Sequence, residues 1–278
     1  MTAQLYIIMN DGYRIPVVGL GTWKSEPGEA TYRAVLDSIN AGYRHIDTAR
    51  AYDNESDVGK AVKDTNIDRK ELFITTKLWN KDQGYDTAIE ACEKSLVRLG
   101  CDYIDLYLIH WPLKGKRNDS WRAFIELQER GLCRSIGVSN FTIQNLEELE
   151  NKFGVIPVAN QVEFHPYHYQ KDLLEYCTSK DIIIEAYSPL VHAKRMNEER
   201  LVAISEEMGK TPAQILIRWA MQRCMVVLPK SVNKNRIIEN FAVFDFEIPN
   251  SLMKRLDDLD EAFVTCWDPH NPPPYAPV

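Results

Sequence analysis

Residues 103–110 read YIDLYLIH, a short apolar run that ends in a histidine. The runs LFITTK at 72–77 and YRHIDTARAY at 43–52 have the same form, because β-branched and aromatic side chains are typical of buried strands. Packing does not explain the polar residues found at or just past the ends of these runs. We interpret them as a candidate proton-delivery site, and they are Asp47, Tyr52, Lys77 and His110.

Strand-like runs alternate with amphipathic stretches from residue 17 onward, and each pair spans about thirty residues, as a strand plus a crossover helix does. The expected strands are 18–21, 45–47, 72–77, 104–110, 135–139, 159–164, 182–187 and 226–229. The expected helices include 29–41, 85–100, 119–131, 142–154, 171–180 and 211–222. Eight strands suggest closure, so the predicted fold is α/β, a (β/α)8 TIM barrel.

Two local patterns refine this fold. Residues 5–18 place apolar flanks around Asn-Asp-Gly, which predicts an N-terminal β-hairpin that caps the barrel bottom. The rival architecture is an open doubly wound sheet, which usually carries G-x-G-x-x-G after its first strand. The stretch GLGTWKSE at 19–26 lacks the third glycine, so the dinucleotide-binding fingerprint of that fold is absent.

Composition limits the class of protein. The 278 residues are 45% apolar and 26% charged, and no Gly/Ser-rich or Pro-rich linker interrupts them, so we expect one barrel domain over 1–278. A net charge of -7 argues against a nucleic-acid partner. Six scattered cysteines without a C-x-x-C pair indicate reduced thiols, and no window approaches the roughly 20 apolar residues of a membrane helix. We expect a cytoplasmic, monomeric enzyme without a membrane partner.

The four polar residues together suit acid catalysis. A tyrosine hydroxyl is a usable acid only if its anion is stabilised, which an ammonium group nearby can do by lowering the tyrosine pKa. Tyr52 would be the acid and Lys77 its tuner, Asp47 would hold Lys77, and His110 would orient a substrate carbonyl. Taken singly, Asp47 could cap a turn and His110 could be structural. Lys77 could equally be a Schiff-base nucleophile.

Seven segments then carry a resemblance to the aldo-keto reductase family, in order and spacing, from Gly19 to Asn240. They are GYRHIDTARAYDNE, TTKLWN, DYIDLYLIHWP, SIGVSNF, NQVEFHP, AYSPL and LPKSVNKNRIIEN. The resemblance implies NADPH-dependent reduction of aldehydes and ketones on a barrel that binds NADPH/NADP+ across the strand ends. It also implies that the family's catalytic tetrad falls on Asp47, Tyr52, Lys77 and His110.

The same resemblance implies cofactor residues. Ser139, Asn140 and Gln161 correspond to hydrogen bonders of the nicotinamide carboxamide, and Tyr187 to the aromatic ring that stacks on the nicotinamide. The group that binds the adenosine 2'-phosphate corresponds to Lys230, Ser231, Asn233 and Arg236, whose charge agrees with NADPH rather than NADH. The remaining implied cofactor contacts are Gly21, Thr22, Ser188, Leu190, Val232, Glu239 and Asn240. Taken alone, residues 230–236 would be an ordinary basic loop.

One departure concerns Val191, which stands where the family commonly has glycine after Ser-Pro-Leu. A loop over a pyrophosphate often needs glycine for close backbone approach, so we expect Val191 to alter the contacts between this loop and the pyrophosphate.

Substrate residues follow from aromatic side chains at strand ends. Trp23, Trp79, His110 and Trp111 would line an open, hydrophobic mouth for small-molecule carbonyl substrates. Short loops resemble those of diketogluconate reductases and protist prostaglandin F synthases, which implies either a prostaglandin F synthase-like enzyme or a broad carbonyl reductase. His165 and His168 lack acidic or cysteine partners at metal-binding spacing, so no metal site is expected.

Two other functions stay open at this point. A class I aldolase would use Lys77 as a nucleophile, and borohydride trapping with a carbonyl substrate would reveal it. A non-catalytic NADPH-binding partner protein would not need to keep an acid such as Tyr52.

Overall fold

The computed structural model describes residues 4–267, so the proline-rich segment at 272–274 lies outside the described residues. Eight parallel strands form the central sheet in the order β3 to β10, each hydrogen-bonded to the next along the chain. They are β3 (Gly19–Gly21), β4 (His45–Asp47), β5 (Phe73–Leu78), β6 (Ile104–Ile109), β7 (Cys133–Ser139), β8 (Ala159–Glu163), β9 (Ile183–Tyr187) and β10 (Val226–Leu228). All eight predicted strands are therefore confirmed.

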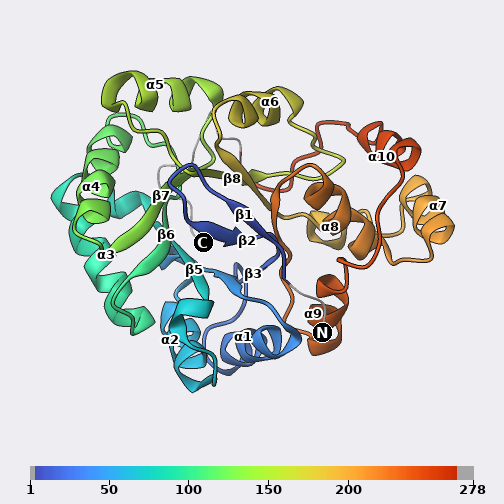
Figure 1. Ribbon diagram of the computed structural model, residues 1–278, viewed down its shortest axis with the longest axis horizontal. Helices are drawn as coiled ribbons and strands as arrows, with labels where there is room; N and C mark the ends of the chain where they lie inside the picture. Colours follow the sequence, from blue (N-terminus) through green and yellow to red (C-terminus); the bar gives the residue numbers. More distant parts are fainter. Residues whose placement is uncertain (1–3, 268–278) are drawn as a thin grey trace.

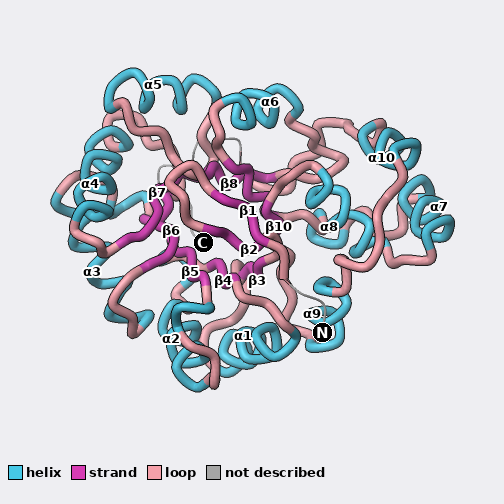
Figure 2. The backbone as a smooth tube through the Cα atoms, in the orientation of Figure 1, coloured by secondary structure: helices cyan, strands magenta, loops and turns pink. Residues whose placement is uncertain are grey.

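The sheet curls so that its first and last strands meet. Val18 bridges Val227 in parallel, and the Val227 amide donates to Val17 O at 2.8 Å. The Gly21 amide donates to Pro229 O at 3.1 Å. Figure 2 shows the resulting ring of strands inside a ring of helices. The predicted (β/α)8 barrel is confirmed.

Ten helices lie outside the strands within the described part of the chain (Figure 1). They are α1 (Glu29–Ala41), α2 (Glu55–Asp64), α3 (Asp86–Leu99), α4 (Arg117–Glu129), α5 (Ile143–Phe153), α6 (Lys171–Ser179), α7 (Glu199–Met208), α8 (Pro212–Gln222), α9 (Lys234–Phe241) and α10 (Asn250–Asp257). Single 3-10 turns are η1 (Arg50–Tyr52), η2 (Arg69–Glu71), η3 (Asn80–Asp82) and η4 (Val191–Ala193).

Helix ends follow the expected chemistry. Thr211 caps α8 in a reciprocal capping box with Gln214, and Pro212 occupies the first turn, where its missing N–H costs nothing. Gly100 and Gly154 end α3 and α5 in the left-handed conformation that glycine adopts without strain. Helices α2, α7, α9 and α10 are not among those named from the sequence.

The hairpin of β1 (Tyr6–Ile8) and β2 (Arg14–Pro16) lies over the middle of the barrel (Figure 1). Ile15 is fully buried and packs in one apolar cluster with Phe73 and Val226, which are the first residues of their strands. Asn10 Nδ2 also donates to Pro157 O, just before β8. The hairpin therefore closes the amino-terminal end of the barrel, as predicted.

Candidate functional site

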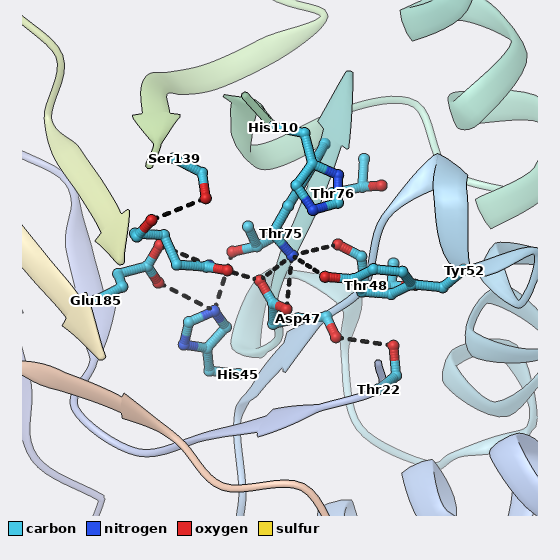
Figure 3. Close-up of polar contacts among 12 residues, drawn as sticks. Thr22, His45, Asp47, Thr48, Tyr52, Thr75, Thr76, His110, Ser139 and Glu185 are labelled. Carbon is cyan, nitrogen blue, oxygen red and sulfur yellow. Dashed lines mark hydrogen bonds and ion pairs between the residues drawn. The ribbon is translucent and has the colours of Figure 1, made fainter. Parts of the chain in front are cut away.

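Four predicted residues meet at the carboxyl ends of neighbouring strands (Figure 3). Asp47 ends β4, Lys77 is the last residue but one of β5, and His110 directly follows β6. Tyr52 ends η1, the turn that follows β4. Because the carboxyl ends of parallel strands share one face of a barrel, residues far apart in sequence converge there.

Lys77 forms a buried ion pair. Its fully buried Nζ donates to Asp47 Oδ1 at 2.7 Å, to Asp47 Oδ2 at 2.8 Å and to Thr48 O at 2.8 Å. Burial raises the pKa of Asp47, while the Lys77 ammonium acts in the opposite direction. A buried cation needs a partner of this kind, so the arrangement holds the ammonium in place.

Tyr52 stands next to this pair. Its half-buried ring lies 5.0 Å from Lys77 Nζ, measured to the ring centroid, and its hydroxyl is 3.4 Å from the same nitrogen. Burial raises the pKa of Tyr52 well above its usual value, and the Asp47 carboxylate raises it further. The net direction of the Tyr52 pKa is therefore opposite to the lowering expected from Lys77.

His110 is a neutral imidazole in this environment. Burial, and secondarily the charge of Lys77, lower the pKa of His110 well below its usual range. The ring meets Tyr52 edge-on at a centroid distance of 5.7 Å and Trp79 at 5.1 Å. Its buried Nδ1 has no hydrogen-bond partner within residues 4–267.

The residues predicted around the nicotinamide lie together on β7, β8 and β9. Ser139 Oγ donates to Gln161 O at 2.8 Å, and Asn140 Nδ2 donates to His110 O at 2.9 Å. The Tyr187 hydroxyl donates to Asn140 Oδ1 at 2.9 Å. Asn140 has a positive φ of 64°, a conformation that asparagine tolerates better than most residues. These bonds join β6, β7, β8 and β9 into one polar rim.

The residues predicted to bind the 2'-phosphate follow β10, which is separated from β5, the strand of Lys77, by β3 and β4. Asn233 accepts from the Arg236 amide at 3.2 Å and so caps α9, which means the basic stretch is part loop and part helix. Ser231 and Asn240 are buried, whereas Lys230 and Arg236 are exposed. Val232 is exposed as well. The Glu239 carboxylate accepts a hydrogen bond from Thr211 Oγ1 at 2.8 Å.

The loops after β3 and β9 contain the other predicted cofactor contacts. Gly21 ends β3, and the buried Thr22 donates its hydroxyl to Asp47 O at 2.9 Å. Beyond β9, Ser188 Oγ hydrogen-bonds His192 Nε2 at 2.9 Å, and Leu190 is half-buried.

Val191 is fully buried and has a φ of 52°. A β-branched residue rarely adopts this left-handed conformation, which glycine adopts freely. His192 and Ala193 continue the left-handed turn with φ values of 50° and 62°. The departure seen in the sequence therefore coincides with backbone strain.

The predicted tryptophans do not form a single cluster. Trp79 contacts His110, whereas Trp111 is 4% exposed and packs against Trp267 at 5.6 Å between ring centroids. Trp23 contacts His192 instead, at 5.3 Å. Trp79 and Trp111 are thus on the His110 side of the strand ends, and Trp23 lies on the β3 side.

Sequence reasoning missed polar residues beneath the site. Glu185 of β9 is fully buried, and Gln161 Nε2 donates both to Glu185 Oε2 at 3.2 Å and to Asp47 Oδ2 at 2.8 Å. Burial, together with the Asp47 carboxylate, raises the pKa of Glu185 to about 8. His45 Nε2 lies 3.8 Å from Glu185 Oε1 and 2.9 Å from Thr75 Oγ1. A carboxylate inside the apolar run IIIEAY was the available signal.

Sequence reasoning also missed a clamp on the chain after α10. Glu163 accepts from the amides of Thr265 at 2.8 Å and Cys266 at 3.0 Å, and from His165 Nε2 at 3.1 Å. Burial alone would raise the pKa of Glu163, but hydrogen bonds from His165 and Thr265 lower it to about 2. This clamp fixes the segment that carries Trp267 beside Trp111.

Within residues 4–267, no group of three or more histidine, cysteine or acidic side chains could hold a metal ion. Over the same range, no helix combines the length and apolar character needed to cross a membrane.

The chain belongs to the aldo-keto reductase family: the model of the Aldo/keto reductase family matches residues 17–261. It is therefore an NADP-dependent oxidoreductase that reduces carbonyl groups, which confirms the predicted enzyme class and cofactor.

Particular relatives are similar over nearly the whole chain. Glyoxal reductase of Bacillus subtilis is 47% identical over 253 residues, which cover 91% of this chain and 92% of that protein. The 9,11-endoperoxide prostaglandin H2 reductase of Trypanosoma cruzi is 43% identical over 268 residues, 95% of each chain. A mutant of Gox0644 solved in complex with NADPH superimposes with a TM-score of 0.92 at 40% identity, covering 96% of this chain and 98% of that chain.

Proposed function

We propose that this protein reduces small aldehydes and ketones with Tyr52 as the general acid. The observation that carries the proposal is the contact of the Tyr52 hydroxyl with Lys77 Nζ at 3.4 Å, where Asp47 holds the lysine by both carboxylate oxygens. A cation fixed beside the hydroxyl stabilises the phenolate that forms when the proton leaves. Bound NADPH supplies a hydride to the carbonyl carbon.

The other residues have positioning roles in this proposal. His110 is neutral and lies against the edge of Tyr52, so one ring nitrogen can donate to a carbonyl oxygen that also meets the Tyr52 hydroxyl. Because Lys77 is occupied by Asp47 and Thr48 O, it serves Tyr52 as a fixed charge. A lysine ammonium held in this way is a poor nucleophile, which disfavours the Schiff-base alternative.

The strand ends fit a nicotinamide dinucleotide. Gln161 Oε1 accepts no hydrogen bond from the described residues, so it is free to bind a carboxamide, and the Tyr187 ring beside it is half-exposed. Lys230 lies in the loop between β10 and α9 and Arg236 in the first turn of α9, where free amides and two cations favour a phosphate. The proposed cofactor residues are Gly21, Thr22, Ser139, Asn140, Gln161, Tyr187, Ser188, Leu190, Lys230, Ser231, Val232, Asn233, Arg236, Glu239 and Asn240.

The proposed substrate classes rest on the tryptophans near His110 and on the similarity to two reductases. Trp79 packs against the His110 ring and Trp111 follows His110 in the chain, and these three with Trp23 are the proposed substrate residues. The similarity to a glyoxal reductase supports small dicarbonyls first. The similarity to a prostaglandin H2 reductase supports a second substrate class, the prostaglandin endoperoxides. We also propose that the protein is a single-domain monomer located in the cytoplasm.

Replacing Tyr52 by phenylalanine tests the acid. We expect the wild-type protein to consume NADPH with methylglyoxal or nitrobenzaldehyde, and Tyr52→Phe to lose at least about 100-fold in kcat, because general acids contribute on the order of 10²–10⁴. NADPH should still quench tryptophan fluorescence in the variant, which shows an intact fold. Near-normal turnover by Tyr52→Phe refutes the role of Tyr52. A covalent adduct trapped by borohydride would instead support the aldolase mechanism.

Replacing the two cations near α9 tests cofactor choice. Lys230→Ala and Arg236→Ala should each weaken NADPH binding by about tenfold or more, since charge-assisted bonds to a phosphate are strong. NADH lacks that phosphate, so its affinity should change little. Equal losses for the two cofactors, measured by calorimetry, contradict a 2'-phosphate site at these residues.

A further inference from the structure

Glu185 is a buried carboxyl group that the proposed reaction does not use. It lies in the middle of β9, two residues before Tyr187, so the two side chains share the inner face of the barrel. Its side chain is fully buried, and Figure 3 shows it beside His45 and Asp47 on the inner side of the strands. A buried carboxyl group costs stability unless its surroundings compensate, so its presence calls for a reason.

The amide of Gln161 links Glu185 to the site. Gln161 Nε2 donates one hydrogen bond to Asp47 Oδ2 at 2.8 Å and another to Glu185 Oε2 at 3.2 Å. A carboxylate is only an acceptor, so the amide nitrogen must face Asp47, and the amide oxygen must point the other way. That oxygen has no partner within residues 4–267 and belongs to the proposed nicotinamide site.

The hydrogen bond to Asp47 alone would leave the Gln161 amide free to rotate about the line of that bond. Asp47 already accepts from Lys77 with both oxygens, so it is shared between two donors. Glu185 accepts the second hydrogen of the Gln161 amide and thereby fixes the amide plane. Gln161 is also 2% exposed, so water cannot take over this task readily.

We propose that Glu185 is a positioning residue which, through Gln161, aims an amide oxygen at the carboxamide of the bound nicotinamide. The inference rests on the proposed function, in that it takes Gln161 as a cofactor contact. The neutral acid suits this place, because burial raises the pKa of Glu185 to about 8 and a second full negative charge next to Asp47 is avoided. His45 and Lys77 are the other ionisable groups near it, and His45 is uncharged because burial lowers its pKa to about 3.

Two substitutions separate this role from simple packing. Glu185→Leu keeps a similar bulk but removes the acceptor, whereas Glu185→Gln keeps both the shape and an acceptor oxygen. Affinity would be measured by calorimetry for NADPH and for 2'-phospho-ADP-ribose, which lacks the nicotinamide. Glu185→Met serves as a second acceptor-free variant if the leucine variant does not fold.

We expect Glu185→Leu to weaken NADPH by about tenfold, the usual effect of one lost hydrogen bond. Its affinity for 2'-phospho-ADP-ribose should stay within about twofold of the wild type, and Glu185→Gln should recover NADPH affinity. Parallel losses for both ligands, or equal NADPH affinity in the leucine and glutamine variants, overturn the proposal. Wild-type protein that binds no NADPH would instead refute the proposed function itself.

Discussion

The pH dependence of stability gives a test of Glu185 that does not depend on catalysis. Glu185 has a pKa of about 8 in the folded protein and an ordinary value of 4.5. Between these values the folded protein holds a proton that the unfolded chain releases. Stability from this group is therefore fully present below the unfolded pKa and is lost as pH rises toward the folded pKa.

The magnitude follows from linkage. Each pH unit inside this window costs about 1.4 kcal/mol of the free energy of unfolding, so the step from about pH 5.5 to about pH 7.5 costs about 3 kcal/mol. Glu185→Gln cannot titrate, so it should gain that amount relative to the wild type over the same step. Other titrating groups act on both proteins and cancel in the difference.

Urea denaturation followed by tryptophan fluorescence at the two pH values measures this difference. Glu163→Gln is a matched control, because the pKa of Glu163 is about 2 in the folded protein and its carboxylate stays ionised throughout the range. Its offset from the wild type should not change with pH. Parallel pH profiles for the wild type and Glu185→Gln would refute the assignment of a neutral, buried acid.

Three further substitutions probe the structure around the site. Gly19→Ala would place a Cβ 2.7 Å from the His45 ring, so we expect a loss of about 1–3 kcal/mol in the free energy of unfolding, measured with urea. Lys77→Met would leave Asp47 buried and unpaired, at a cost of about 3–5 kcal/mol, and adding Asp47→Asn should recover part of it; no recovery argues against the ion pair. Glu163→Gln should cost about 1–3 kcal/mol, and proteolysis of the segment after α10 should quicken; unchanged proteolysis would show that the clamp does not hold that segment.

The barrel could be predicted from the sequence because the patterns that indicate its strands lie within short segments. Runs such as 104–110 combine strand propensity with a polar terminus, and a parallel barrel collects all such termini on one face. The positions of Asp47 and Lys77 followed from this rule. Helices α9 and α10 were missed, since each has only eight residues, a length at which an apolar pattern does not separate a helix from a strand.

Other features depend on contacts that sequence patterns do not record. The pKa of Tyr52 is raised first by burial and then by the Asp47 carboxylate, and neither its burial nor its distance from Asp47 can be read from the sequence. Glu185 looked like one charge in an apolar run until Gln161 was seen to join it to Asp47. The clamp at Glu163 links residues about a hundred positions apart.

The meeting of β3 and β10 has a consequence for synthesis on the ribosome. Val18 and Val227 are partners although 209 positions separate them, as 227 minus 18 gives. During synthesis β3 is therefore an unpaired strand edge until nearly the whole chain has emerged, and such edges invite pairing with other chains. Closure of the ring must be a late event in folding, and a chain released before residue 226 would keep two open edges.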